Sequence, residues 1–455
     1  MRHNIFVLFI PMAIAIVAFF SCNDGFLETK PDKALLVPET LEDFEYLLNN
    51  IALMNNRSPY LQEVAADDYF TTDAGFSRIE QYLQDAYIWV PNEHTISFED
   101  WTAPYLQIFY ANTVLDGLEK IDSNLEKYNK LKGGALFFRA MAMYSLLQEF
   151  AEPYNEDRAD EILGLPYPLD SDVNKRPERS TLRKCYTQMI QDIKAAESLL
   201  PLKVAFPSEP SGMAAKALLM RVYLVMANYD KAETYAENIL AAGTSLMDYN
   251  DISATPSKPL VPSEFNGNPE VIFYTTFCAN TYILNIYGLT FVDTLLYASY
   301  DDHDLRKSLF FKNKNENQYN FRGSYTIGTF TGLAVDEVYL VGAECRARRG
   351  DREGALEMLN ALLEKRWKKG TFEPMEVVDS ESVLKIILIE RRKELVSRGV
   401  RWSDLRRLNP EEALQTTIEK RMTGENYVLP PNDKRYTFPL PEDELSVNDI
   451  EQNPQ

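Results

Sequence analysis

Histidine, glycine and cysteine are scarce in this chain of 455 residues, and each shortage excludes a class of protein. The three histidines are too few for a histidine-rich metal centre. Glycine supplies 19 of 455 residues, about 4% against a typical ~7%, which disfavours a β-rich fold with many tight turns and favours helices. No C-x-x-C pair occurs, so the cysteines form no zinc motif.

Three cysteines lie far from the N-terminus, at Cys185, Cys278 and Cys345, without regular spacing. Cys185 and Cys345 fall within helical patterns, where a free thiol behaves as a small hydrophobe. We predict buried, unreactive thiols. One disulfide among the three is the alternative, in an oxidising compartment.

Positive charge is also in short supply, with 47 Lys and Arg against 68 Asp and Glu and a net charge of −21. A surface of that sign repels phosphate backbones, so we expect no nucleic-acid partner. The 45% hydrophobic and 25% charged residues are ordinary for globular proteins and exclude a wholly disordered chain. The 26 tyrosines and 24 phenylalanines exceed what a plain helical scaffold requires.

An uncharged run over residues 5–20 follows Arg2 and His3. As a helix it spans about 24 Å, short of the ~30 Å hydrocarbon core of a bilayer, and it therefore indicates a secretory signal. The small residue before Cys22 resembles a bacterial lipobox, in which the cysteine is acylated and becomes the mature N-terminus. We predict a lipoprotein signal peptide over residues 1–21 and lipidation, such as with palmitate, at Cys22. The alternatives are an ordinary signal peptide with an incidental cysteine, or a retained anchor.

Apolar residues recur at i, i+3 and i+4 along much of the chain, which predicts amphipathic helices packed on their neighbours. The second helix is expected to begin only after Gly133-Gly134, and residues 153–179 are expected to form a loop. The predicted helices cover residues 105–121, 135–147, 182–200, 214–226, 231–242, 335–349, 383–398 and 402–408.

The helices 214–226 and 335–349 each begin a helix pair. In both pairs the turn, its Asp and the Ala that follows resemble the tetratricopeptide unit, with Ala232 and Ala355 in equivalent positions. Their separation of 123 residues (355 − 232) is far from one ~34-residue period, so the units are not in tandem. The stretch between them, residues 244–332, is rich in proline and aromatic residues. We predict strands at 269–274 and 324–330, and an extended C-terminal segment over 436–455.

Several separated motifs, in the same order, resemble those of the SusD/RagB family of nutrient-binding outer-membrane lipoproteins. The resemblance covers the whole mature chain. It rests on Cys22 to Glu28, Trp101 to Asn112, Phe138-Arg139-Ala140, Ala215 to Leu224, Asn268 to Phe273, Ala343 to Asn360, Glu390 to Leu395, Arg401 to Arg407, Phe438 to Pro441 and Gln452-Asn453-Pro454.

The resemblance implies a mainly α fold, namely a tetratricopeptide-like helix-pair scaffold, or SusD-like α-α superhelix, with loop-rich insertions and a few short strands. It implies one SusD-like domain over residues 22–455, with an N-terminal part to about 243, an insertion over about 244–332 and a C-terminal part from about 333. It also implies a non-catalytic lipoprotein of the outer membrane that faces the cell exterior. Such a protein captures glycans or oligopeptides and delivers them to a SusC-like TonB-dependent transporter.

Aromatic residues outside the helices are candidates for ligand binding, in segments 80–100 and 280–300. A Tyr or Trp ring covers the apolar face of a sugar while its polar group bonds the hydroxyls. We predict ligand contacts at Tyr82, Trp89, Tyr297 and Tyr300. The alternative for each is a place in the core, and the sequence does not show that the two segments converge.

The segment from residue 390 to 407 is dense in charge. Local ion pairs on the helices are favoured, because acidic and basic residues occur at i, i+3. Trp402 is expected to anchor the helix over residues 402–408. The alternative is that the arginines bind an anionic ligand. The predicted pairs are Glu390 with Lys393, Arg391 with Glu394, and Asp404 with Arg407.

Two acidic clusters, Asp67-Asp68 and residues 301–304, are the conspicuous candidates for catalysis or metal binding. Neither is an obvious glycosidase pair, which needs facing carboxylates ~5–9 Å apart, and the second lacks the spacing of an EF-hand. No nucleophile elbow, zinc-protease helix or P-loop is present. We therefore predict solvated surface acids, no catalytic residue, no metal and no cofactor. Calcium binding, a secreted helical glycoside hydrolase or lyase, and a purely structural adaptor are the alternatives.

Overall fold

The computed structural model describes residues 38–91, 98–121, 126–262, 267–278, 289–376 and 379–454. The predicted signal peptide and Cys22 lie outside these ranges. Residues 41–455 form one compact unit. Within the described ranges, every helix is too short or too polar to cross a membrane.

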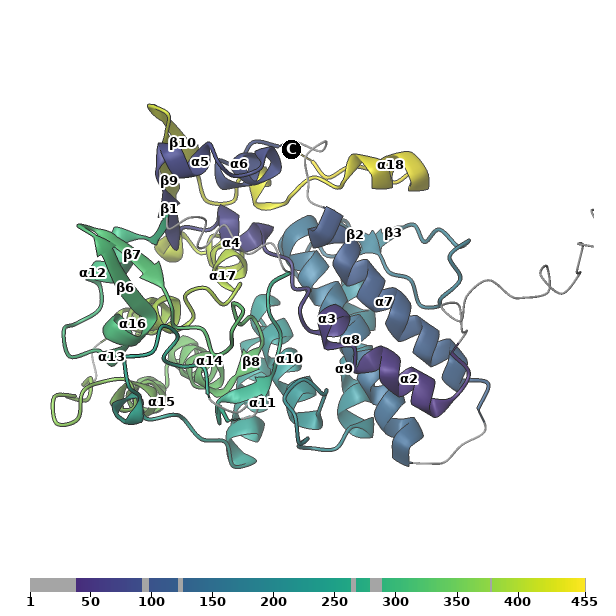
Figure 1. Cartoon of the computed structure of the whole chain (residues 1–455), viewed down its shortest axis with the longest axis horizontal. Helices are drawn as coiled ribbons and strands as arrows, with labels where there is room; N and C mark the ends of the chain where they lie inside the picture. Colours follow the sequence, from purple (N-terminus) through teal and green to yellow (C-terminus); the bar gives the residue numbers. More distant parts are fainter. Residues whose placement is uncertain are drawn as a thin grey trace, which may run out of the picture. The chain divides into compact units, whose positions relative to one another are not determined.

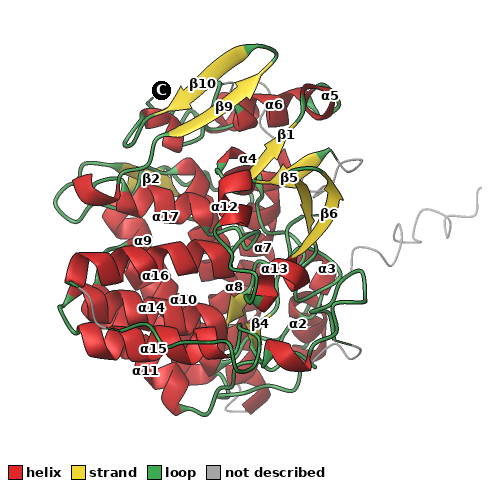
Figure 2. Cartoon of the chain, turned by 90° about the vertical axis from the view of Figure 1, so that its left-hand side faces the viewer, coloured by secondary structure: helices red, strands yellow, loops and turns green. Residues whose placement is uncertain are grey.

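Helices dominate the structure, as predicted (Figure 1 and Figure 2). The longest described helices are α7 and α8, and single 3-10 turns occur at residues 249–251, 412–414 and 434–436. The helices are α2 (Leu41–Leu48), α3 (Ile51–Met54), α4 (Leu61–Ala65), α5 (Asp73–Phe76), α6 (Gln81–Tyr87), α7 (Phe98–Leu118), α8 (Glu126–Phe150), α9 (Leu182–Leu199), α10 (Gly212–Val225), α11 (Tyr229–Ala241), α12 (Thr294–Ala298), α13 (Leu305–Phe310), α14 (Val335–Arg348), α15 (Arg352–Glu364), α16 (Ser380–Glu394), α17 (Arg401–Leu408) and α18 (Glu442–Asn448).

The strands are short and form separate antiparallel pairs, β1 with β5, β2 with β3, β4 with β8, β6 with β7 and β9 with β10. The first and third pairs join the insertion to the rest of the chain, with Tyr69 opposite Val292 and Val271 opposite Ala334. The strands are β1 (Tyr69–Thr71), β2 (Leu163–Pro166), β3 (Arg179–Thr181), β4 (Val271–Phe273), β5 (Thr290–Val292), β6 (Phe311–Asn315), β7 (Gln318–Phe321), β8 (Leu333–Ala334), β9 (Ile418–Met422) and β10 (Glu425–Leu429).

Side-chain caps fix where several scaffold helices begin. The side chain of the residue before the helix accepts a hydrogen bond from a backbone N–H of the first turn, which otherwise has no partner. This occurs at Thr181 before α9, Ser211 before α10, Asn228 before α11 and Asp351 before α15. The predicted boundaries of these helices therefore agree with the structure to within a few residues.

Helix α8 begins seven residues before Gly133, so the prediction that the helix starts after the glycine pair was wrong. The glycines serve close packing inside the helix. A Cβ atom at Gly133 would lie 2.8 Å from Cγ of Leu200, and one at Gly134 would lie 3.4 Å from Cδ1 of Leu48. Glycine allows α8 to approach α2 and the end of α9, and this gain outweighs its poor helix propensity.

The scaffold is a stack of helices in which α7, α8, α9, α10, α11, α14, α15 and α16 each contact the next. The two tetratricopeptide-like pairs, α10 with α11 and α14 with α15, are thus neighbours in space although the insertion separates them in sequence (Figure 1). At Gly342 of α14 a Cβ atom would lie 2.8 Å from Sδ of Met358 and 3.6 Å from Cβ of Ala236. Small residues allow α14 to pack closely on both α15 and α11, which confirms the predicted helix-pair scaffold.

Two predictions about irregular segments were wrong. Residues 324–330 do not form a strand, because the Ser324 hydroxyl donates to Gly328 O and accepts from Phe330 N, which closes the segment into a turn. The C-terminal segment is not extended throughout, since it contains α18. This helix follows Pro441, carries three acidic residues in its first turn, where the helix dipole favours them, and ends at Asp449 with φ 48°.

Buried ion pairs connect the insertion to the C-terminal helices. The Arg306 guanidinium donates to Asp304 (2.7 Å), Glu390 (2.6 Å) and Glu394 (2.9 Å), and Arg306 is fully buried. The other oxygen of Glu394 accepts from Arg366, at 2.8 Å. Charges taken out of water are costly unless each is paired, so these side chains hold one another in place.

A second set of buried pairs joins α14, α16 and α17. Asp404 accepts from Arg391 and from Arg407, both at 2.8 Å. Arg407 also donates to Glu344 of α14 (2.6 Å), and Arg391 lies 3.3 Å from Glu337. Long-range contacts therefore take up most of the charge that the sequence places between residues 390 and 407.

The predicted local pairs are partly confirmed. Lys393 lies 2.7 Å from Glu390, and the pair of Asp404 with Arg407 forms as expected. The predicted pair of Arg391 with Glu394 was wrong, because Glu394 faces the insertion while Arg391 faces α14 and α17. Trp402 is fully buried, as expected of an anchor.

Replacing Arg306 with leucine should destabilise the fold strongly, because three buried carboxylates would lose a shared cation. We expect Arg306→Leu to lower the free energy of unfolding by about 3–5 kcal/mol, measured by urea denaturation followed by circular dichroism. The control is Arg183→Leu, which removes exposed pairs to Glu156 and Asp160 and should leave the midpoint almost unchanged. Equal effects of the two substitutions would contradict the assignment.

Candidate functional site

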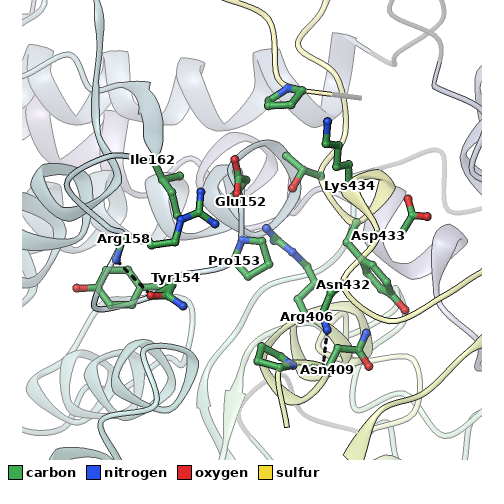
Figure 3. Close-up of a pocket in the computed structure, with 15 residues that line it drawn as sticks. Glu152, Pro153, Tyr154, Arg158, Ile162, Arg406, Asn409, Asn432, Asp433 and Lys434 are labelled. Atoms are coloured by element: carbon green, nitrogen blue, oxygen red, sulfur yellow. Dashed lines mark hydrogen bonds between the residues drawn. The ribbon is translucent and has the colours of Figure 1, made fainter. Parts of the chain in front are cut away.

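A pocket of about 480 Å³ lies between the loop that follows α8 and the residues that follow α17 (Figure 3). Its walls come from residues 152–162, 406–410 and 432–437, and Pro454 completes it. We call it the tyrosine–asparagine pocket, after its two tyrosines and three asparagines. Its volume falls within the ~300–1,000 Å³ that is usual for small-molecule sites.

Local hydrogen bonds shape the wall that follows α8. The Asn155 side chain accepts from the backbone N–H groups of Asp157 (3.0 Å) and Arg158 (3.2 Å), which closes a turn. The ring of Tyr154 packs against Tyr186 of α9, with ring centroids 4.7 Å apart. A loop that sequence analysis treated as a mere connection therefore supplies one side of the pocket.

The opposite wall rests on the end of α17. Asn432 donates to the backbone carbonyl of Asn409 at 3.0 Å and has φ 60°, a left-handed conformation that asparagine tolerates. Tyr436 packs on the buried Trp402, with ring centroids 4.7 Å apart. Burial raises the pKa of Tyr436 to about 12, so its hydroxyl keeps its proton at neutral pH. The anchor of α17 thus also positions the pocket.

Arg406 lines the pocket from α17 and is itself buried. Its guanidinium donates to the carbonyls of Gln148 and Ala151 at the C-terminal end of α8, where a cation is favourable. It forms no ion pair with a carboxylate among the described residues. Burial lowers the pKa of Arg406 to about 10, which leaves it charged, while burial raises the pKa of neighbouring Glu149 well above its usual range. Arg406 therefore keeps its positive charge, which Glu149 and Glu152 attract without forming an ion pair with it.

The pocket combines tyrosine rings and three prolines with amide, hydroxyl and charged groups. Apolar surfaces with a few convergent hydrogen-bonding groups suit a small polar ligand. Asparagine amides both donate and accept, so they can bond neighbouring hydroxyls. None of the predicted ligand residues belongs to the described residues that line this pocket. The weak signal that sequence analysis overlooked is the clustering of asparagine, tyrosine and proline at 153–155, 409–410 and 432–436.

A second pocket, of about 510 Å³, is bordered by the β9–β10 hairpin, and we call it the hairpin pocket. Thr71 of β1 pairs with Thr290 of β5 and donates its backbone N–H to the Tyr87 hydroxyl, so the described parts of segments 80–100 and 280–300 meet there. Tyr87 lines it from the first segment, and Asp293 and Leu295 from the second. Arg392 and Lys420 are among the other ionisable residues of its lining. The two predicted segments therefore converge, although the sequence did not show it.

Two of the four predicted ligand aromatics lie in the core. Trp89 is 3% exposed and its Nε1–H donates to the Ala65 carbonyl at 2.9 Å. Tyr300 is 2% exposed and its hydroxyl donates to the Lys393 carbonyl at 2.7 Å. Burial and a satisfied polar group are what a structural role requires.

The other two are half-buried. Tyr82 shares a hydrogen bond with the Tyr60 hydroxyl. Tyr297 stacks on Tyr319 with ring centroids 3.4 Å apart, and Lys307 lies over its ring. All four assignments stay predictions. Tyr297 lies on the same short helix as Leu295, which lines the hairpin pocket.

The adjacent acids Asp67 and Asp68 are not solvated, contrary to the prediction. Arg401 donates to Asp67 at 2.7 Å, and Arg392 donates to Asp68 at 2.8 Å. The nearby guanidinium groups hold the pKa of Asp67 well below its usual range. These carboxylates attach the segment between α4 and β1 to α16 and α17. Their partners lie more than 300 residues away in the sequence, so no local pattern indicates the pairing.

The prediction of solvated acids is partly confirmed for the second acidic cluster, residues 301–304. Asp301 and Asp302 are exposed, as predicted, whereas Asp304 is buried against Arg306. Among the described residues, no group of three or more His, Cys, Asp or Glu side chains is placed to hold a metal ion. The free cysteines are buried, which confirms that prediction: Cys185, Cys278 and Cys345.

Lys420, on β9, lines the hairpin pocket, and its ammonium group lies over the rings of Tyr87 and Trp89. Its ammonium group donates to the carbonyls of Val64 (3.1 Å) and Ala65 (3.2 Å) and lies 3.9 Å from the centre of the Tyr87 ring and 4.9 Å from that of Trp89. Burial lowers the pKa of Lys420 to about 7. This buried contact attaches the hairpin to α4.

Comparison with known proteins gives two family models, and together they match 323 of the 455 residues (200 + 123). Residues 25–224 match a model described as starch-binding and associating with the outer membrane, and residues 333–455 match that of the SusD family. The SusD-like protein P2 of Formosa agariphila is 24% identical over 416 residues, covering 76% of this chain and 78% of that protein.

Solved structures share the fold. A putative sugar-binding protein from Bacteroides vulgatus superimposes with a TM-score of 0.73 at 23% identity, covering 92% of this chain and 99% of the other. A SusD superfamily protein from Bacteroides thetaiotaomicron gives 0.74 at 23% identity, covering 91% and 100%. At this identity the structures establish the architecture, and they do not transfer a ligand.

The pKa of Lys420 predicts a pH-dependent stability. Between pH 7 and the ordinary lysine value of 10.5, the unfolded chain binds a proton on this residue that the folded chain lacks, so raising the pH stabilises the fold. We expect the unfolding free energy of the wild type to rise relative to that of Lys420→Met from about pH 6.5 to about 9.5 in urea titrations. Lys312→Met, at an exposed position on β6, keeps Lys420, so its profile should stay parallel to that of the wild type. Parallel profiles for all three proteins would refute the prediction.

Proposed function

This chain belongs to the SusD family, and on that premise we propose that it is a non-catalytic binding protein of the cell surface that captures glycans. Oligopeptides are the alternative class of ligand. We further propose that it delivers its ligand to a SusC-like TonB-dependent transporter. Support comes from the two family models, which match the N-terminal and C-terminal parts in order, and from the description of the first as starch-binding.

We place the ligand in the tyrosine–asparagine pocket. The observation that carries this proposal is the convergence of tyrosine rings and asparagine amides in one open cavity of about 480 Å³. Rings cover the apolar face of a sugar, and amides bond its hydroxyls. Of the predicted contacts Tyr82, Trp89, Tyr297 and Tyr300, we propose the half-buried Tyr82 and Tyr297 as further ligand contacts, since Trp89 and Tyr300 are enclosed in the core.

We propose that the protein is anchored in the outer membrane, facing the cell exterior, by lipid on Cys22 after removal of residues 1–21. The description of the matching family as associating with the outer membrane supports this location. Acyl chains hold a protein to a membrane without a spanning helix, and two or more chains make the attachment stable.

The alternative, a helical glycoside hydrolase or lyase, is less well supported by the pocket. A glycosidase uses two carboxyl groups about 5–9 Å apart. The acidic residues among the described lining are Glu152 and Asp433, and Asp433 is engaged by Arg435 at 2.9 Å. That pairing holds the pKa of Asp433 below its usual value, which is unsuited to a general acid.

Purified protein lacking its first 22 residues should bind oligosaccharides without cleaving them. We expect Tyr154→Ala to weaken binding about tenfold, because truncating the ring removes buried apolar area together with ~0.5–1.5 kcal/mol of aromatic contact. Tyr46→Ala, at a residue 76% exposed on α2, is the matched control and should bind as the wild type does. Isothermal titration gives the affinity, and chromatography of the recovered sugar tests turnover. Cleaved sugar in amounts matching the protein would overturn the non-catalytic assignment.

Replacing Cys22 with alanine should abolish lipid attachment. Cells expressing the wild type are expected to incorporate labelled palmitate into the protein, and cells expressing Cys22→Ala are not. Fractionation should move the variant from the outer membrane to the soluble fraction. Cys185→Ala, at a buried cysteine, is the control and should keep its label. Palmitate incorporation by Cys22→Ala would contradict the proposed anchor.

A further inference from the structure

Cations outnumber anions in the tyrosine–asparagine pocket, although the whole chain carries a charge of −21. Arg158, Arg406 and Lys434 line it, and Figure 3 shows the guanidinium groups of Arg158 and Arg406 extending into the pocket from opposite walls. A local charge opposite in sign to that of the whole molecule requires a separate explanation.

The three cations are not used for structural ion pairs. Arg158 and Lys434 are exposed, and neither pairs with a carboxylate among the described residues. Arg406 is buried on backbone carbonyls alone. By contrast, Arg391 and Arg407, from the same charged segment, are fully paired with carboxylates of α14 and α17.

The acidic residues of the lining do not balance these charges. Asp433 is held by Arg435 through two hydrogen bonds of 2.9 Å, from Nε and from Nη2. Glu152 is then the one carboxylate in the described lining that forms no ion pair with a cation outside the lining. Three positive charges therefore stand against one negative charge.

Grouped cations repel one another, and the repulsion is relieved when an anion binds between them. Guanidinium groups suit carboxylate and sulfate oxygens because their N–H donors form paired hydrogen bonds with them. Asparagine amides and tyrosine rings in the same pocket suit hydroxyl groups and sugar faces. This combination favours an acidic sugar over a peptide terminus.

We propose that the tyrosine–asparagine pocket selects saccharides that carry carboxylate or sulfate groups, with Arg158 and Lys434 contacting the anion and Arg406 supplying a fixed positive charge behind it. This inference rests on the proposed saccharide-binding function and narrows it to acidic sugars.

The test uses matched pairs of oligosaccharides and isothermal titration. One pair is trigalacturonate and its methyl ester, and the other is a sulfated carrageenan oligosaccharide and its desulfated form. We expect at least one acidic member to bind, and its neutral counterpart to bind about tenfold more weakly or worse, since the neutral member lacks the charge-assisted hydrogen bonds. The two pairs separate carboxylate from sulfate as the recognised group. Added NaCl should weaken the binding of the acidic oligosaccharide more than that of the neutral one.

The double variant Arg158→Gln/Lys434→Gln should lose this preference, because both residues are exposed and removing them leaves the fold intact. Lys312→Gln/Lys314→Gln, on the exposed β6 strand, makes the same change in net charge and is the control. Equal affinity for acidic and neutral members, or an unchanged preference in the first double variant, would overturn the inference and leave saccharide binding standing. If no saccharide binds, including those of a neutral panel, the proposed function itself is overturned. Binding of peptides alone would do the same.

Discussion

Glu394 of α16 is the point at which the insertion and the segment that follows α15 are held to that helix. Its two carboxylate oxygens accept from Arg306 and Arg366, and all three side chains are fully buried. Removing such charges from water costs several kcal/mol per ion, a cost offset only when every partner is present. The insertion, which carries Arg306, and the helix stack, which carries Glu394, therefore acquire their final arrangement together.

The same kind of constraint positions the proposed ligand pocket. Arg407 of α17 is paired with Asp404 and Glu344, which fixes the rotation of that short helix. Arg406 is the preceding residue and so points about 100° away around the helix axis, towards the end of α8 and the pocket. Neighbouring arginines thus serve different ends: one is neutralised in the interior, and the other remains as a charge beside the cavity.

The helix pairs could be predicted from sequence because periodic apolar residues and capping residues act locally. The contact of α11 with α14 was not predicted, since no local signal spans the insertion. Features that depend on distant partners could not be predicted. They are the buried ion pair of Asp68 with Arg392, the pairing of β1 with β5, and the early start of α8, whose glycines allow close packing against other helices. Aromatic residues were chosen by type alone, and type does not distinguish Trp89, which is enclosed, from Tyr154, which lines a cavity.

Cys185, Cys278 and Cys345 lie apart in the interior as free thiols. The described part of the chain therefore gains nothing from covalent cross-links, which in secreted proteins commonly supply about 2–5 kcal/mol each. A chain exported unfolded across a membrane would need neither an oxidant nor a disulfide isomerase to reach this structure. At the cell surface, where we propose that the protein works, its stability would then rest on apolar packing and buried ion pairs and be indifferent to redox state.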